Sequence, residues 1–193
     1  MKRIDELERE YVLDVLDGQF KTSQGAVYMT KFENAFSDKF KSKFSISHVN
    51  GTATMHSALE ASGVGYGDEV IVPPLTMSAT SLAVLHANAT PIFADIDIDT
   101  FVIDVKSIEE KITKKTKAII TVALYGLSPD MDPIMDIAKK YNLIVIEDNA
   151  EAFLSYYKGR LVGTLGHAAS FSFQSSKHLT AGEGGIITTN DEQ

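Results

Sequence analysis

The sequence contains no cysteine, which excludes disulfides, thiolate nucleophiles and cysteine-type zinc sites together. It also lacks a long apolar run, because stretches such as residues 118–124 fall far short of the roughly 20 residues that a membrane-spanning helix requires. Residues 1–10 carry too many charges to form a signal peptide. We therefore expect a cytoplasmic protein that does not enter a membrane.

Basic residues are in the minority and histidines are few. The 18 lysines and arginines are scattered among 26 aspartates and glutamates, so the net charge is −8, which argues against a nucleic-acid or anionic-membrane surface. The five histidines include no pair at a metal-ligand spacing such as His-Glu-x-x-His. With 193 residues, 44% of them hydrophobic, the chain can bury a sizeable core. The composition indicates a globular domain and argues against a metal enzyme or a nucleic-acid-binding protein.

Two helical patterns open the chain. Residues 7–16 and 27–44 carry apolar side chains at the spacing of one helix face. We interpret residues 1–45 as an N-terminal helical arm and residues 46–193 as the main domain.

Short apolar runs alternate with helical patterns from residue 46 onward. Strands are expected at residues 69–72, 91–95, 118–123, 143–148 and 170–173. Helices are expected between them at residues 52–62, 79–88, 105–111 and 133–141. This alternation predicts an α/β fold in which a mostly parallel, mixed sheet is sandwiched by helices. Right-handed crossovers would place the carboxyl ends of the strands along one edge, where ligands bind.

One more strand is expected at residues 185–189. Only a short polar loop, residues 175–184, separates it from the preceding strand, and a loop of that length cannot hold a parallel crossover. This strand should therefore run antiparallel. The sequence then stops without a covering helix, and we interpret residues 46–193 as an incomplete large domain.

The first stretch that carries chemistry begins at Asn50. Gly51, Thr52 and Ala53 follow it and open the helix expected at residues 52–62. Free backbone N–H groups and the positive end of the helix dipole would form a phosphate cradle there. Taken alone, the stretch fits a plain helix capped by Thr52 better, because such caps are common.

The second stretch is an apolar strand that ends in Asp148. A carboxylate buried at the ligand edge needs a cationic partner, and a protonated pyridine nitrogen would serve. Two other roles for Asp148 fit this stretch equally well. Asp148 could cap the next segment, or it could bind Mg²⁺ together with the nearby Glu147 and Glu151.

The third stretch is a turn that contains Lys177 among small residues and glycines. A partly desolvated lysine at the mouth of a sheet can form a Schiff base. Ser172 and Ser175 could donate to a phosphate, and the glycines would let the backbone approach a ring closely. An isolated lysine in a turn is usually a solvated surface charge, but the residues around Lys177 favour the chemical interpretation.

Together and in this order, the three stretches resemble the DegT/StrS family of nucleotide-sugar aminotransferases that use pyridoxal 5′-phosphate (PLP). That family has the aspartate-aminotransferase-like fold, and the resemblance covers nearly the whole chain. Gly51, Thr52 and Ala53 match the family's Gly-Thr-x-Ala-type helix start, residues 147–151 its acidic strand end, and residues 172–177 its Ser-Phe-x-x-x-Lys stretch.

The resemblance implies PLP as cofactor and a role for each matching residue. The helix start and Ser172 would bind the phosphate, Asp148 would pair with the pyridine nitrogen, and Glu151 would lie against the ring or its hydroxyl. Lys177 would carry the cofactor and act as general base, so that Lys177 and Asp148 are the expected catalytic residues. The sequence has Met77 where relatives commonly place an aromatic residue that stacks on the cofactor, and a thioether can still cover a ring face.

The implied activity moves an amino group from glutamate or glutamine to a keto group on a sugar, preferably nucleotide-linked. A cyclitol ketone or a small phosphorylated ketone is an alternative acceptor. The resemblance also implies a homodimer and a C-terminal small domain that this chain does not contain.

Three other functions are alternatives to this interpretation. The chain could be an inactive, truncated remnant of such an enzyme. It could be a PLP-dependent sugar dehydratase, but relatives of that type replace the lysine with histidine, and Lys177 argues against it. It could be a nucleotide-binding module of the Rossmann type, but Gly63, Gly65 and Gly67 precede a strand instead of following one.

Overall fold

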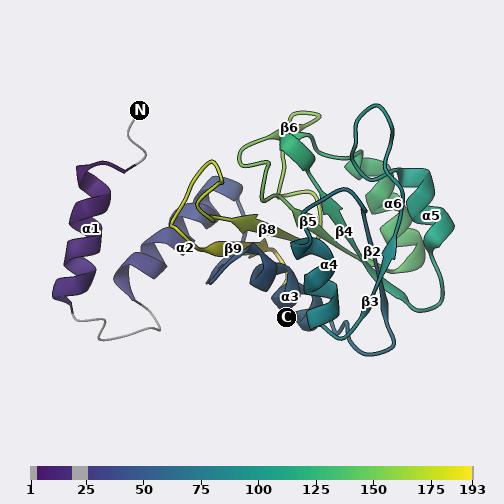
Figure 1. Cartoon of the computed structure of the whole chain (residues 1–193), viewed down its shortest axis with the longest axis horizontal. Helices are drawn as coiled ribbons and strands as arrows, with labels where there is room; N and C mark the ends of the chain where they lie inside the picture. Colours follow the sequence, from purple (N-terminus) through teal and green to yellow (C-terminus); the bar gives the residue numbers. More distant parts are fainter. Residues whose placement is uncertain (1–3, 19–25, 193) are drawn as a thin grey trace.

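A computed structural model describes residues 4–18 and 26–192 (Figure 1). Its helices are α1 (Glu6–Asp17), α2 (Val27–Phe40), α3 (Gly51–Ala61), α4 (Ala79–His86), α5 (Val105–Lys111), α6 (Met131–Tyr141) and the 3₁₀ turn η1 (Leu124–Gly126). Its strands are β1 (Phe44–His48), β2 (Glu69–Val72), β3 (Thr90–Phe93), β4 (Thr116–Val122), β5 (Ile144–Asp148), β6 (Tyr156–Tyr157), β7 (Arg160–Leu161), β8 (Ala168–Ser172) and β9 (Gly185–Thr189).

Seven of these strands form one sheet in the order β1-β9-β8-β5-β4-β2-β3. The pairs from β8 to β3 are parallel, whereas β9 runs antiparallel to both β8 and β1. The predicted mixed, mostly parallel sheet is therefore confirmed, and so is the antiparallel direction of residues 185–189. The carboxyl ends of β2, β4, β5 and β8 lie along one edge.

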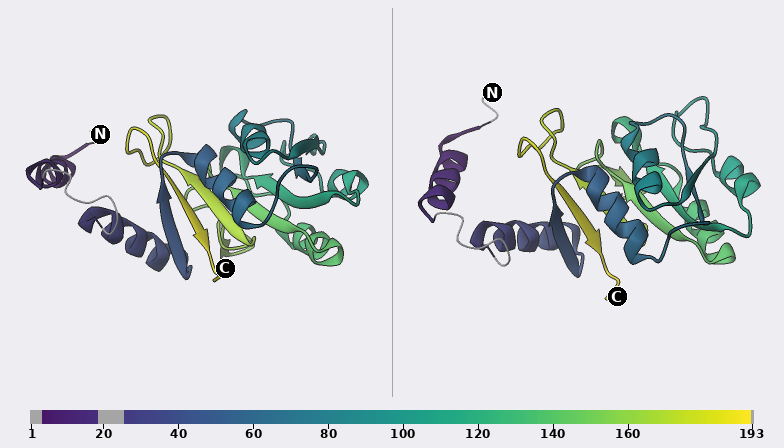
Figure 2. Two further views of the ribbon diagram at one scale, coloured as in Figure 1. Left: turned by 90° about the horizontal axis from the view of Figure 1, so that it is seen from below. Right: turned by 60° about the horizontal axis from the view of Figure 1, so that its bottom comes forward.

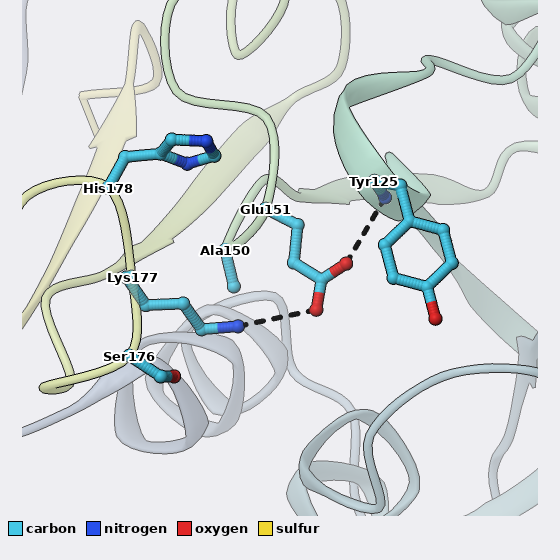
Figure 3. Close-up of a pocket in the computed structure, with 6 residues that line it drawn as sticks. All are labelled: Tyr125, Ala150, Glu151, Ser176, Lys177 and His178. Atoms are coloured by element: carbon cyan, nitrogen blue, oxygen red, sulfur yellow. Dashed lines mark hydrogen bonds and ion pairs between the residues drawn. The ribbon is translucent and has the colours of Figure 1, made fainter.

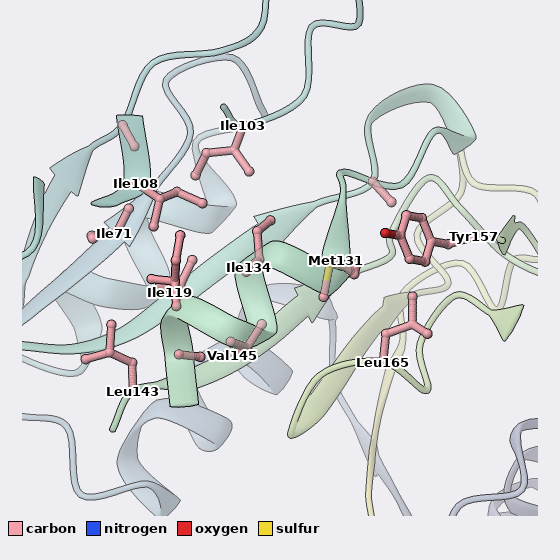
Figure 4. Close-up of a cluster of buried hydrophobic side chains, with 14 of the residues drawn as sticks. Ile71, Ile103, Ile108, Ile119, Met131, Ile134, Leu143, Val145, Tyr157 and Leu165 are labelled. Atoms are coloured by element: carbon pink, nitrogen blue, oxygen red, sulfur yellow. The ribbon is translucent and has the colours of Figure 1, made fainter. Parts of the chain in front are cut away.

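Helices cover both faces of the sheet (Figure 2). α5 and α6 pack on one face, where Ile134 and Ile119 belong to the largest buried cluster (Figure 4). α3 and α4 cover the other face, where Leu59 packs with Ile120. Ile119 and Ile120 are neighbours in β4, so the alternation of a strand's side chains supplies both cores from one apolar run.

The helical arm differs from the expectation at its end. α2 stops at Phe40, because Lys41 adopts a left-handed conformation (φ 53°), and residues 44–48 form β1 instead of extending the helix. The predicted helix at 27–44 was therefore too long, and the edge strand was missed. Phe36 and Phe40 of α2 pack on β8 and β9.

α1 lies beyond α2 and away from the sheet in Figures 1 and 2. None of its residues is buried, and Tyr11 contacts Tyr28 of α2 with the ring centroids 4.8 Å apart. The division into an arm and a large domain at residue 45 stays a prediction. No helix in the described part of the chain combines the length and the apolar character needed to cross a bilayer.

Candidate active site

A cavity of about 440 Å³ opens at the carboxyl edge of the sheet. We call it the inner pocket. It is lined by residues from the α3 start, the β2–α4 connection, the end of β5 and the turn between β8 and β9. Seven of the eight predicted site residues line it: Gly51, Thr52, Met77, Asp148, Glu151, Ser172 and Lys177.

Ala53 is the predicted residue that does not line the inner pocket. Its backbone N–H donates to the side chain of Asn50 (2.9 Å), which makes Asn50 the N-cap of α3. The alternative in which Thr52 caps this helix is therefore wrong. Asn50 satisfies the N–H of Ala53 and leaves the earlier N–H groups of the first turn, which have no intrahelical acceptors, to face the pocket.

The start of α3 is held tightly against β8. A β-carbon on Gly51 would lie 3.0 Å from the β-carbon of Ser172, so any larger residue would push the helix start and β8 slightly apart. The carbonyl of Gly51 accepts the hydroxyls of Thr54 (2.6 Å) and Ser170 (3.3 Å), both fully buried. These contacts hold the α3 start against β8, where a β-carbon on Gly51 would lie 3.5 Å from the hydroxyl oxygen of Ser172.

Gly185 supports the same helix start from β9. A β-carbon at this position would lie 2.5 Å from the carbonyl carbon and oxygen of Asn50. The strand registers pair Gly185 with Ser172 on one side and with His48 on the other. β9 therefore passes directly against the Asn50–Gly51 peptide.

Asp148 also lines the inner pocket and is 5% exposed. It accepts hydrogen bonds from the Thr80 hydroxyl (3.1 Å) and the Ala150 N–H (3.2 Å). Burial raises the pKa of Asp148, although those two hydrogen bonds and the charge of Lys177 lower it. A buried carboxylate of this kind is stabilised by a cation placed beside it.

Glu147 does not take part in the pocket. Its carboxylate accepts the backbone N–H groups of Gly163 (2.8 Å), Leu165 (2.7 Å) and Gly166 (2.7 Å). Burial raises the pKa of this carboxyl as well. Because the Glu147 carboxylate is engaged elsewhere, it cannot join Asp148 in binding Mg²⁺. Within the described residues, no three His, Cys, Asp or Glu side chains form a group that could hold a metal ion.

Lys177 reaches toward Glu151 (Figure 3). The two charged groups lie 3.5 Å apart, and their side chains are 17% and 27% exposed. The other carboxylate oxygen of Glu151 accepts the backbone N–H of Tyr125 (3.1 Å). Lys177 is thus a sheltered, oriented ammonium group and not a solvated surface charge.

Several residues of the site were not anticipated. Thr80, which is buried behind the pocket lining, carries the hydroxyl that binds Asp148, and a single threonine in an apolar helix gives no sequence signal of that contact. Asn50 could have been identified, because asparagine directly before a helix is a strong N-cap. Ser175 was expected to face a phosphate, but Ser176 lines the inner pocket in its place.

Comparison with known proteins agrees with this geometry. The family model described as "DegT/DnrJ/EryC1/StrS aminotransferase family" matches residues 2–193. The GDP-perosamine synthase of Caulobacter vibrioides is 48% identical over 190 residues, which cover 98% of this chain and 51% of that protein. The chain thus spans about half the length of this relative.

Two solved structures are also similar. An aminotransferase from Psychrobacter cryohalolentis superposes with a TM-score of 0.93 at 43% identity, over 98% of this chain and 48% of that one. The GDP-4-keto-6-deoxy-D-mannose-3-dehydratase of E. coli, solved with bound hydrated PLP, gives a TM-score of 0.90 at 32% identity, over 100% of this chain and 50% of that one. The predicted fold of a PLP-dependent transferase large domain is therefore confirmed, and the chain belongs to the DegT/DnrJ/EryC1/StrS aminotransferase family.

Proposed function

We propose that this chain forms the cofactor-binding part of a PLP-dependent sugar aminotransferase. The enzyme would move an amino group from glutamate or glutamine to a keto group on a sugar, preferably nucleotide-linked. The observation that carries the proposal is the convergence of Asp148, Lys177 and the start of α3 on one pocket of about 440 Å³.

The residues of the inner pocket fit PLP at each end. The α3 start, with its space for an anion beside Ser172, suits the phosphate. Asp148 is buried without a cation in direct contact among the described residues, and a protonated ring nitrogen would supply one. Met77 lines the pocket where it could cover a ring face.

Bound PLP supplies an electron-accepting ring that stabilises negative charge on the substrate carbon. Asp148 would hold the ring nitrogen in its charged form. Lys177 Nζ would bind the cofactor and would also move a proton at the substrate carbon. Glu151 orients this amine through the ion pair of 3.5 Å.

The choice of a sugar-like acceptor comes from relatives. Proteins named GDP-perosamine synthase in two further organisms, Escherichia coli and Vibrio cholerae, match at 49% and 37% identity. A Micromonospora echinospora relative at 42% identity is named as a putative aminotransferase of an amino-dideoxy-scyllo-inosose, which keeps a cyclitol ketone as an alternative acceptor.

The sugar dehydratase alternative is less well supported. Lys177 occupies the inner pocket, and His178, the next residue, lines a neighbouring cavity instead. The position that dehydratases fill with histidine therefore carries an amine here.

We further propose that the enzyme works as a cytoplasmic homodimer. An apolar groove of about 650 Å³ lies between α1 and α2, and α1 buries none of its residues in its own chain. A second copy could cover this surface, because exposed apolar patches of this kind are typical of interfaces.

Titration with PLP tests the function. The purified protein should gain the visible absorption band of a lysine-bound cofactor, and glutamate should bleach it. Lys177→Ala should abolish the band, whereas Lys106→Ala, which changes an exposed lysine of α5, should keep it. A wild-type protein that stays colourless with excess PLP would favour the inactive remnant.

A further inference from the structure

A second cavity, of about 500 Å³, lies beside the inner pocket. We call it the outer pocket. Its lining consists of Tyr125, Ala150, Glu151, Ser176, Lys177 and His178 (Figure 3). Four of these residues, Ala150, Glu151, Ser176 and Lys177, line both cavities. The amine of Lys177 therefore borders two spaces, and a cofactor in the inner pocket would leave the outer one for a substrate.

Tyr125 is held in an unusual conformation at this pocket. Its backbone is left-handed (φ 50°, ψ 28°), and the next residue, Gly126, also has a positive φ of 91°. Such a conformation is costly for a bulky residue and persists only where its surroundings enforce it. Glu151 does so by accepting the Tyr125 N–H at 3.1 Å. The carboxylate that pairs with Lys177 thus also fixes Tyr125.

The side chain of Tyr125 packs little against its own chain. It is 87% exposed although it is a large aromatic residue. Strained backbone combined with an exposed ring is difficult to explain by stability, because neither feature adds packing. Both are explained if the ring contacts a ligand in the outer pocket.

The opposite side of the outer pocket is formed by the turn that contains Lys177. His178 follows the lysine directly and is exposed at the pocket, and Ser176 precedes it. Imidazole and hydroxyl groups can each donate or accept a hydrogen bond.

The charges of this pocket indicate what it would bind. Lys177 and Glu151 compensate each other, and the lining contains no arginine. The remaining contacts are a phenol, a hydroxyl and an imidazole, which suit a neutral ring with several hydroxyl groups better than a dicarboxylate such as glutamate.

We propose that the outer pocket binds the sugar ring of the amino acceptor, with Tyr125 packed on the ring and His178 bonded to a hydroxyl. Tyr125 and His178 are then specificity-determining residues for the acceptor and not for the amino donor. This inference rests on the proposed aminotransferase function.

The amino donor and the amino acceptor react with the cofactor in two separate half-reactions, so the binding of each can be measured on its own. PLP-loaded protein is titrated separately with glutamate and with a panel of amino sugars carried on GDP, UDP or dTDP. Binding is followed by visible absorption and, independently, by isothermal titration calorimetry. Tyr125→Ala and His178→Asn should each raise the dissociation constant of the amino sugar by about threefold to tenfold. Both variants should leave glutamate binding unchanged.

Substitutions of the same residue types outside the outer pocket control for effects on the protein that do not depend on this pocket. Tyr66→Ala removes a tyrosine that is 96% exposed, and His86→Asn removes an exposed histidine, both outside the outer pocket. Neither should change binding of either ligand. Tyr125→Phe keeps the ring and should retain most of the amino-sugar affinity.

Three results would overturn the assignment: equal losses for both ligands, no loss for the amino sugar, or a wild-type protein that responds to glutamate and to no amino sugar. A wild-type protein that binds no PLP would instead refute the proposed function itself.

Discussion

Glu147 and Asp148 are consecutive residues of β5, yet their carboxylates serve opposite purposes. Glu147 accepts three backbone N–H groups of the loop before β8, whereas Asp148 accepts two hydrogen bonds and faces the inner pocket. A strand alternates its side chains between two faces, so one strand end supplies both an anchor for β8 and an anionic group for a ligand.

Glu147→Ala should destabilise the fold strongly. The substitution leaves three N–H donors without their acceptor, the buried ones of Gly163 and Leu165 and the partly buried one of Gly166. We expect a loss of about 3 kcal/mol or more in the free energy of unfolding, measured with urea. Glu110→Ala, at a side chain that is 63% exposed, is the control. A Glu147→Ala protein as stable as this control would contradict the anchoring role.

Asp148→Asn should change how stability depends on pH. Burial raises the pKa of Asp148 in the folded state, so the wild-type carboxyl favours folding when protonated and loses this contribution as the pH rises through the raised value. The variant, without PLP, should therefore gain stability relative to wild type as the pH rises above about 4. Urea unfolding at several pH values measures the difference. A difference independent of pH would refute the prediction.

Gly185→Ala should disturb the phosphate end of the inner pocket. The added β-carbon would lie 2.5 Å from the Asn50 carbonyl, so the α3 start must shift. We expect a loss of about 1–3 kcal/mol in stability and weaker PLP binding in a titration. Gly184→Ala adds a methyl group that meets its nearest neighbour at 3.4 Å and should be tolerated. Equal PLP affinities for the two variants would show that the close approach of β9 does not shape the site.

Tyr125→Asn should stabilise the protein slightly. Asparagine tolerates the left-handed backbone better than tyrosine, and the exposed ring contributes little packing. We expect a gain of about 0.5–1 kcal/mol in the free energy of unfolding. Tyr66→Asn should give no such gain, because Tyr66 has no positive φ. A loss of stability in Tyr125→Asn would show that the ring supports the fold.

The sequence predicted the fold where apolar runs were short and clearly bounded. Residues 69–72, 105–111 and 185–189 form the expected elements with the expected bounds. Sequence patterns were less informative where tertiary packing determines the local structure. Nothing at Lys41 marks the end of α2, since a lysine rarely adopts the left-handed conformation found there. In β1 the apolar Phe44 and Ile46 face outward, against the usual pattern.

Motif order placed seven of the eight predicted site residues in the inner pocket, because strand ends at one sheet edge must lie near each other. It could not predict contacts made across elements. The hydroxyl of Thr80 reaches Asp148 from a helix 68 residues earlier in the chain. Nothing in the sequence singles out Tyr125, because a sequence does not reveal a positive φ at a tyrosine.

Lys177 lies in the connection between β8 and β9, and the pairing of these two strands sets Gly185 opposite Ser172. A one-residue slip of β9 would turn its inward side chains outward and replace Gly185 by a bulkier neighbour at the helix start. An insertion within β9 would cause such a slip. The two strands must therefore keep one fixed register for Gly185 to stay against the start of α3.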